Sequence, residues 1–180
     1  RKQRAAEAGA LDTVVAALRA HAAHSGVQEL ACRALINVCY GTDAAGLARK
    51  QRAAEAGALD AMVAAMRAHD AHSRVQEQAC HALRNVCAGT DAAGLARKQR
   101  AAEAGALEAV VAAMRAHAAH SGVQEQACRA LISVCADTDA AGLARKQRAA
   151  QAGALEAVVA AMRAHSAYTD VQEVTCRVLT

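Results

Sequence analysis

Residues 49–54 read Arg-Lys-Gln-Arg-Ala-Ala, and the same six residues begin at Arg1, Arg97 and Arg145, so the motif recurs every 48 residues. A fixed period of this length is typical of repeat proteins, in which each unit buries its apolar face against the next unit. Recognition surfaces then recur along the chain, whereas an enzyme needs different groups that converge on one point. We expect a single array of the units 1–48, 49–96, 97–144 and an incomplete 145–180.

The composition favours an all-α chain. Pro, Phe and Trp are absent, and the only aromatic residues are Tyr40 and Tyr168. Ala, which is abundant, has the best helix propensity and Pro the worst, so only the glycines interrupt helix formation. No uninterrupted apolar run approaches the ~20 residues that span a bilayer. We therefore expect a helical protein without membrane insertion.

The seven cysteines predict reduced core thiols. Residues seven positions apart, such as Cys32 and Cys39, lie ~10.5 Å apart along a helix, whereas a disulfide tolerates a Cα separation of ~7 Å. Equivalent cysteines of neighbouring repeats are separated by about a helix diameter, ~10 Å, which is also too far. Reduced thiols indicate a cytoplasmic or nuclear protein. We expect one continuous core column of Cys32, Cys80, Cys128 and Cys176.

Caps and apolar periodicity divide one repeat into three helices. The first begins at Thr42 or Asp43, both of which suit an N-cap, and ends at Glu55 before a turn that Gly57 supplies. The second helix ends near His69, where polar side chains suit exposed carbonyls. Its core-facing residues have the i, i+3, i+4, i+7 spacing and are Leu59, Met62, Val63 and Met66.

The third helix follows a predicted capping box, Ser73-x-x-Gln76, which recurs at Ser25, Ser121 and Thr169. In the first unit its apolar residues share one helix face and are Val27, Ala31, Cys32, Leu35, Val38 and Cys39. The opposite face carries a polar row that is directed away from the core. This row is Glu29, Arg33, Asn37 and Tyr40.

Two stretches of each repeat resemble the armadillo repeat. They are Glu-Ala-Gly-Ala-Leu at 55–59 and Val-Gln-Glu-x-Ala-Cys-x-Ala-Leu-x-Asn-Val-Cys at 75–87. The resemblance implies a right-handed α-solenoid of three-helix repeats whose third helices line a concave groove. Armadillo proteins bind extended peptides in this groove, so the resemblance implies a non-enzymatic protein- or peptide-binding scaffold. HEAT repeats are the close alternative, but they usually have two helices and lack this glycine turn.

The resemblance also implies which residues line the groove. The family's third-helix Asn, which hydrogen-bonds the peptide backbone, corresponds to Asn37 and Asn85, and the third unit has Ser133 instead. The alternative to a binding role is a solvent-exposed face on which Glu and Arg four residues apart form weak ion pairs. The expected groove residues are Glu29, Arg33, Asn37, Tyr40, Glu77, His81, Arg84, Asn85, Glu125, Arg129, Ser133, Glu173 and Arg177.

The repeated basic motif Arg49-Lys50-Gln51-Arg52 is a second candidate surface. A stripe of stacked basic motifs attracts acidic tails, nucleic acid or anionic lipid through a salt-sensitive term. Neighbouring acidic residues hold the formal net charge to +4, and no aromatic residues interleave for base stacking, which disfavours nucleic acid. We predict a solvated helical face here. Anionic binding along the stripe, or an array that only stacks end to end with other chains, remains the alternative function.

A third pattern is His-x-x-His, found as His69 and His72 and repeated in the first and third units. Zinc sites need three or four protein ligands, and only Asp70 offers a third ligand, in one unit. We predict polar loop residues at a helix end, and no metal or cofactor. Buried thiols are inert and no glycine-rich phosphate loop is present, so no catalytic activity is expected.

Overall fold

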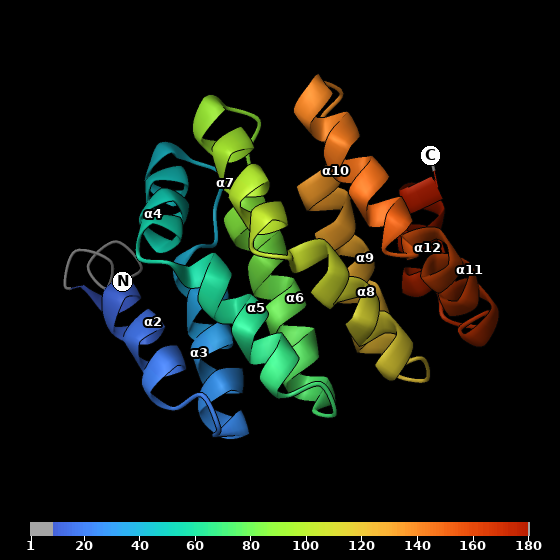
Figure 1. Cartoon of the computed structure of the whole chain (residues 1–180), viewed down its shortest axis with the longest axis horizontal. Helices are drawn as coiled ribbons and strands as arrows, with labels where there is room; N and C mark the ends of the chain where they lie inside the picture. Colours follow the sequence, from blue (N-terminus) through green and yellow to red (C-terminus); the bar gives the residue numbers. More distant parts are fainter. Residues whose placement is uncertain (1–8, 180) are drawn as a thin grey trace.

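The computed structural model describes residues 9–179, and this part of the chain is all α-helical (Figure 1). The predicted start of the first unit, which contains Arg1, lies outside the described residues. The described residues form eleven helices and no strand. The helices are α2 (Ala10–Ala20), α3 (Ser25–Val38), α4 (Ala44–Glu55), α5 (Ala58–Ala68), α6 (Ser73–Cys87), α7 (Ala92–Glu103), α8 (Ala106–Ala116), α9 (Ser121–Cys135), α10 (Ala140–Gln151), α11 (Ala154–Ala164) and α12 (Thr169–Leu179).

Within residues 9–179, the first and second helices of the repeats begin and end where the sequence predicts. The Asp43 carboxylate accepts a hydrogen bond of 2.9 Å from the amide of Gly46 and caps α4, and Asp91 and Asp139 do the same for α7 and α10. Gly57 has a φ of 87°, in the left-handed region, and separates α4 from α5. This positive φ favours glycine at the turn, and the end of the flexible Arg19 side chain lies close to where a Cβ of residue 57 would be.

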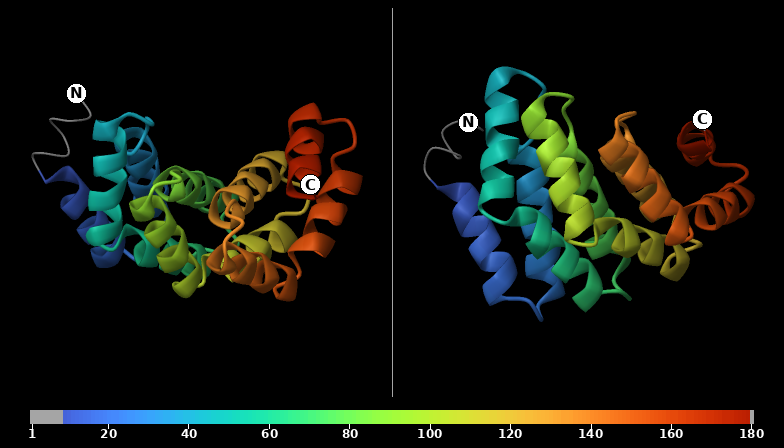
Figure 2. Two further views of the ribbon diagram at one scale, coloured as in Figure 1. Left: turned by 90° about the horizontal axis from the view of Figure 1, so that it is seen from above. Right: turned by 45° about the horizontal axis from the view of Figure 1, so that its top comes forward.

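Equivalent helices pack against one another from repeat to repeat. The third helices α3, α6, α9 and α12 contact each other in that order, and the second helices α2, α5, α8 and α11 do likewise. Figure 1 shows the successive groups of helices side by side in a row. The row is curved, and the third helices lie on its inner side (Figure 2, left). The polar faces of the third helices are thereby brought toward one another.

The apolar stripe of the second helix is confirmed as core. Leu59, Met62, Val63 and Met66 are all buried. In α3, Ala31, Cys32, Leu35 and Cys39 are also buried, whereas Val27 and Val38 are half-buried. One continuous hydrophobic cluster extends from Leu11 on α2 to Val174 on α12. The period-3.6 pattern therefore identified the core faces correctly, because burial of these stripes holds neighbouring repeats together.

The cysteines are free, and five of them are buried, whereas Cys135 is half-buried. Cys176 is exposed, so the predicted core column is wrong at its last member. In the described residues no helix follows α12 to cover this thiol. Burial raises the pKa of the Cys32 thiol to about 12 and, against the opposing effect of nearby cations, that of Cys39 to about 11.

The predicted capping box is wrong in its details. The N-cap of α3 is His24, whose Nδ1 accepts a hydrogen bond of 3.4 Å from the amide of Val27, and Ser25 is the first helical residue. The Gln28 amide does not return to the cap. It instead donates to the carbonyls of Leu18 and His21 at 3.0 and 2.8 Å, and so satisfies the C-terminal end of α2.

The prediction that the basic motif is a solvated face is wrong for its first arginine and for two of its lysines, whereas Arg52, Arg100 and Lys146 are exposed. Arg97 and Lys98 are 2% exposed, and the equivalent residues Arg49, Lys50 and Arg145 are buried. The guanidinium of Arg97 donates to the backbone oxygens of Val86 at 2.8 Å and Ala88 at 3.0 Å, and to Oε1 of Gln51 at 3.2 Å. This arginine therefore satisfies carbonyls at the end of the third helix and connects two successive first helices.

The buried arginine predicts a large loss of stability on truncation. We expect Arg97→Leu to lower the free energy of unfolding by about 3 kcal/mol or more, because it leaves buried acceptors without their charged donor. The change is measured by urea denaturation followed by circular dichroism at 222 nm.

Arg100→Leu is the matched control on the same helix. Its ion pair with Asp60 is exposed and 3.6 Å long, so the expected loss is below about 1 kcal/mol. Equal losses for the two variants would contradict the role assigned to Arg97.

Thiol exposure gives a second prediction. In the native protein we expect Cys176 to react rapidly with a polar disulfide reagent, whereas Cys32, Cys80 and Cys128 react only after unfolding. Burial blocks access, and raising the Cys32 pKa from 9.0 to about 12 lowers its thiolate fraction about a thousandfold. Mass spectrometry after short labelling locates the modified residues. The fast phase should vanish in Cys176→Ser, and its persistence would show that the core is open to the reagent.

Candidate functional site

The third helices and the loop between α3 and α4 enclose the candidate binding site, a cavity of about 440 Å³. It draws its lining from four repeats, which the curvature of the row brings close together. Predicted groove residues in its wall are Tyr40, Arg84, Asn85, Arg129, Ser133 and Arg177. We refer to this space as the groove cavity. The remaining predicted groove residues lie outside it, namely Glu29, Arg33, Asn37, Glu77, His81, Glu125 and Glu173.

The predicted Asn position contacts the preceding third helix. Nδ2 of Asn85 donates to the carbonyl of Ile36 at 3.3 Å, and Oγ of Ser133 donates to the carbonyl of Arg84 at 3.1 Å. Asn37 is exposed. Among the described residues, Oδ1 of Asn85 accepts no hydrogen bond. The side chain of Asn85 is thereby fixed in orientation while its oxygen remains available to a ligand.

The groove cavity is strongly cationic. Its lining residues include Lys50, Arg84, Arg129 and Arg177, and they include no Asp or Glu. Burial, followed by the charges of Arg129 and Arg177, lowers the pKa of the Arg84 guanidinium. Glu125 offsets part of this charge through its ion pair with Arg129 at 2.9 Å, an i, i+4 contact of the kind the sequence predicts. The cavity is therefore arranged to attract an anionic group.

Lys50 is the cavity residue that sequence analysis missed, because it was assigned to a solvated motif. The side chain is 2% exposed, and it reaches the cavity wall from α4. Burial, followed by the charge of Arg97, lowers the pKa of its ammonium group. Nothing in the described part of the chain accepts a hydrogen bond from this group. A signal was available, since Arg49 and Lys50 share the helix face of Gly46, Ala53 and Ala54, all of them buried.

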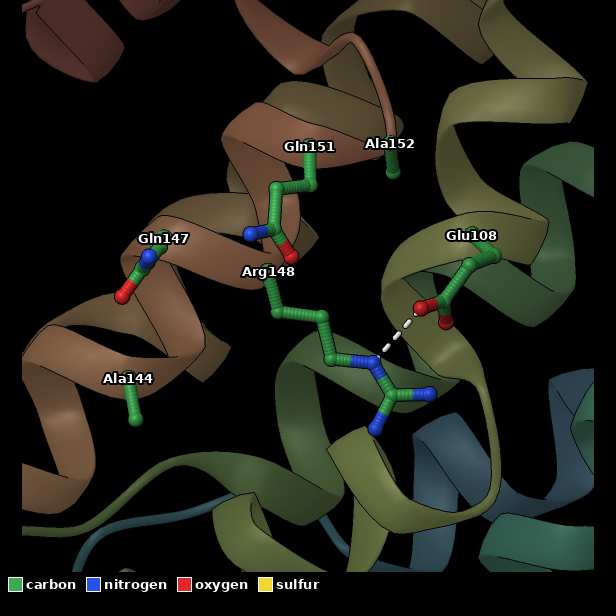
Figure 3. A pocket seen from close by; sticks show the side chains of 6 residues that line it. All are labelled: Glu108, Ala144, Gln147, Arg148, Gln151 and Ala152. Carbon is green, nitrogen blue, oxygen red and sulfur yellow. Dashed lines mark hydrogen bonds and ion pairs between the residues drawn. The ribbon is translucent and has the colours of Figure 1, made fainter.

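The second arginine of the basic motif is paired with an acidic residue of the preceding repeat. Arg52 contacts Asp12 at 3.4 Å, and Arg148 contacts Glu108 at 2.5 Å. Figure 3 shows the Arg148 pair in a shallow pocket between α8 and α10, flanked by Gln147 and Gln151. These arginines thus bridge repeats, and the stripe presents fewer free positive charges than the sequence suggested.

The histidines also connect repeats. As predicted, they lie at helix ends: His69 and His165 are the C-cap residues of α5 and α11, and both are buried in the turn. Nε2 of His69 lies 2.7 Å from the carbonyl oxygen of Ala22 in the preceding repeat, and His165 makes the same contact with Ala118 at 2.8 Å. In residues 9–179 no group of three or more metal-ligating side chains converges. The His-x-x-His pattern therefore has a structural use.

No family model matches the chain, and neither a curated protein nor a solved structure matches it significantly. Within the described range, no helix is both long and apolar enough to cross a membrane.

Proposed function

We propose that this chain is a non-enzymatic scaffold that binds a protein or an extended peptide along the inner side of the curved row. The single observation that carries the proposal is the groove cavity, in which polar and charged side chains from four repeats line one concave space. Such a space suits an extended chain, since each repeat adds similar contacts along one line. Asn85 supports this use because its oriented amide has a free acceptor.

We further propose that the repeats form a right-handed α-solenoid of the armadillo type. This proposal is supported by the 48-residue recurrence of the helix bounds, by the glycine turn at Gly57, and by the ordered contacts among equivalent helices. The position of the third helices on the inner side is also in keeping with it. The proposed compartment is the cytoplasm or nucleus, since the cysteines are free.

Selection from a random peptide library tests the proposed function. We expect immobilised protein to enrich extended peptides whose affinity falls about fivefold or more in an Asn85→Ala, Arg129→Ala double variant, because two direct contacts are lost. Binding is measured by fluorescence anisotropy with the enriched peptides.

Arg52→Gln with Arg100→Gln is the matched control, since it removes two arginines from the outer face. The groove proposal expects an unchanged affinity here. The alternative function, an anionic partner along the basic stripe, expects the reverse pattern and a flatter salt dependence. The groove proposal would be refuted if the outer variant lost peptide binding while the groove double variant bound the peptide as tightly as wild type.

A second candidate function, end-to-end stacking, is favoured by the apolar surface at α11. Leu155 and Val159 are 49% and 36% exposed, whereas the equivalent Leu107 and Val111 of the preceding repeat are each 1% exposed under α11 and its neighbours. Contiguous exposed apolar surface of this kind favours association. The occupant that fits this face is the N-terminal repeat of a second copy, because internal repeats cover the same residues with the next repeat.

We expect the chain to associate as its concentration rises, and Leu155→Glu to suppress the association by placing a charge in the apolar contact. Sedimentation velocity across a concentration series measures the effect. Ala64→Glu introduces the same charge at an exposed position of α5 and should leave association unchanged. A wild-type chain that remains monomeric throughout the series would exclude stacking.

A further inference from the structure

Lys98 is the equivalent of Lys50 in the next repeat, and its contacts show what a lysine at this position binds. In that repeat Lys98 is 2% exposed, and its Nζ lies 2.7 Å from Oδ1 of Asp137. The other carboxylate oxygen of Asp137 accepts from Nη2 of Arg145 at 2.5 Å. One carboxylate thus neutralises two buried cations, and this combination of charge and hydrogen bonds compensates for their removal from water.

The same arrangement is incomplete one repeat earlier. Forty-eight residues before Lys98, Asp137 and Arg145 stand Lys50, Gly89 and Arg97, so the carboxylate is replaced by a residue without a side chain. Arg97 compensates by donating Nη2 to the backbone oxygen of Ala88 at 3.0 Å. Lys50 has no such substitute. Its side chain is 2% exposed, and its ammonium group forms no ion pair among the described residues. The charge of Asp43 offsets only part of the effect of burial on the Lys50 pKa.

The missing carboxylate coincides with an open space. Lys50 and Ala88 both line the groove cavity, and Arg84, Arg129 and Arg177 line it as well. A further donor in this region, Nε of Arg129, is buried and has no hydrogen-bond partner within the described residues. A lysine without an ion pair and a buried donor without a hydrogen-bond partner are both unfavourable, and an anion from outside the chain would satisfy them. The cavity therefore provides both the room and the charge for an external acidic group.

We propose that the groove cavity binds the carboxylate of an Asp or Glu side chain in an extended acidic segment of a partner protein, with the Lys50 ammonium as its main contact. This inference rests on the proposed peptide-binding function and names its ligand class. A carboxylate is favoured over other anions because Asp137 already occupies the equivalent position beside Lys98. Nucleic acid is disfavoured because Tyr40 is the only aromatic side chain in the cavity wall.

The probe is a fluorescein-labelled decaglutamate peptide, with decaglutamine as its neutral counterpart. Wild-type protein should bind decaglutamate and not decaglutamine. Lys50→Met keeps an unbranched side chain of similar length but removes the charge. We expect it to weaken decaglutamate binding about ten- to a hundredfold, as for the loss of one charge-assisted contact. Anisotropy titrations at fixed ionic strength measure both affinities.

Thermal unfolding of the same variant separates a binding role from a structural role. Replacing a buried cation that has no partner by an apolar residue is neutral or stabilising, so the melting temperature of Lys50→Met should be unchanged or higher. Lys98→Met is the matched control at the equivalent position. It should leave decaglutamate binding within about twofold of wild type and lower the melting temperature, because Asp137 loses one of its two ion pairs.

Several results would overturn the inference. They are unchanged decaglutamate binding in Lys50→Met, equal losses in Lys50→Met and Lys98→Met, equal affinity for decaglutamine, or a lower melting temperature in Lys50→Met. A single-stranded decanucleotide that binds more tightly than decaglutamate in a Lys50-dependent manner would also reject the carboxylate. If library peptides bind the groove but carry no acidic residues, only this inference fails. If no peptide binds the groove at all, the proposed function fails with it.

Discussion

The guanidinium of Arg97, like those of Arg49 and Arg145, lies buried where a third helix ends and the next first helix begins. The Nε–H donates to the carbonyl of Val86, Val38 or Val134 at 2.7 to 2.8 Å. Helix C-termini leave carbonyls without intrahelical partners, and burial makes that state costly. One arginine per repeat therefore allows the third helix to end inside the protein. The curved row and the groove cavity both depend on this connection.

Most polar side chains that recur with the repeat are used between helices rather than on the surface. Gln76 satisfies the end of the second helix in its own repeat by donating to Met66 and His69 at 2.8 Å. His69 contacts the turn of the preceding repeat, and Arg52 pairs with Asp12 across the same boundary. These bonds fix the relative position of successive repeats, because apolar contacts alone are non-directional. Their recurrence explains why the polar residues repeat as faithfully as the core.

Some sequence differences between repeats lie at positions where the side chain can change without loss of the hydrogen bonds between repeats. Gly89 and Asp137 occupy equivalent positions, and the exchange decides whether a buried lysine is neutralised from within or left facing the groove cavity. Asn85 and Ser133 likewise differ, yet each bonds the preceding third helix. Substitutions at equivalent positions thereby give each repeat different side chains facing the groove, while the packing between repeats stays the same.

Local sequence patterns are enough to predict the helices and their buried stripes. These signals are local: the apolar period, the Asp43 cap and the Gly57 turn each involve residues within one or two helical turns. They can therefore be recognised without knowledge of the tertiary structure. These local patterns do not predict the environment of the basic motif. Whether Lys50 is solvated depends on which helix covers it, and the cavity that it lines with Arg84 and Arg177 is formed by residues of four repeats. Only the tertiary structure brings these charges together, because the curvature of the row is a property of repeat packing and not of any single repeat.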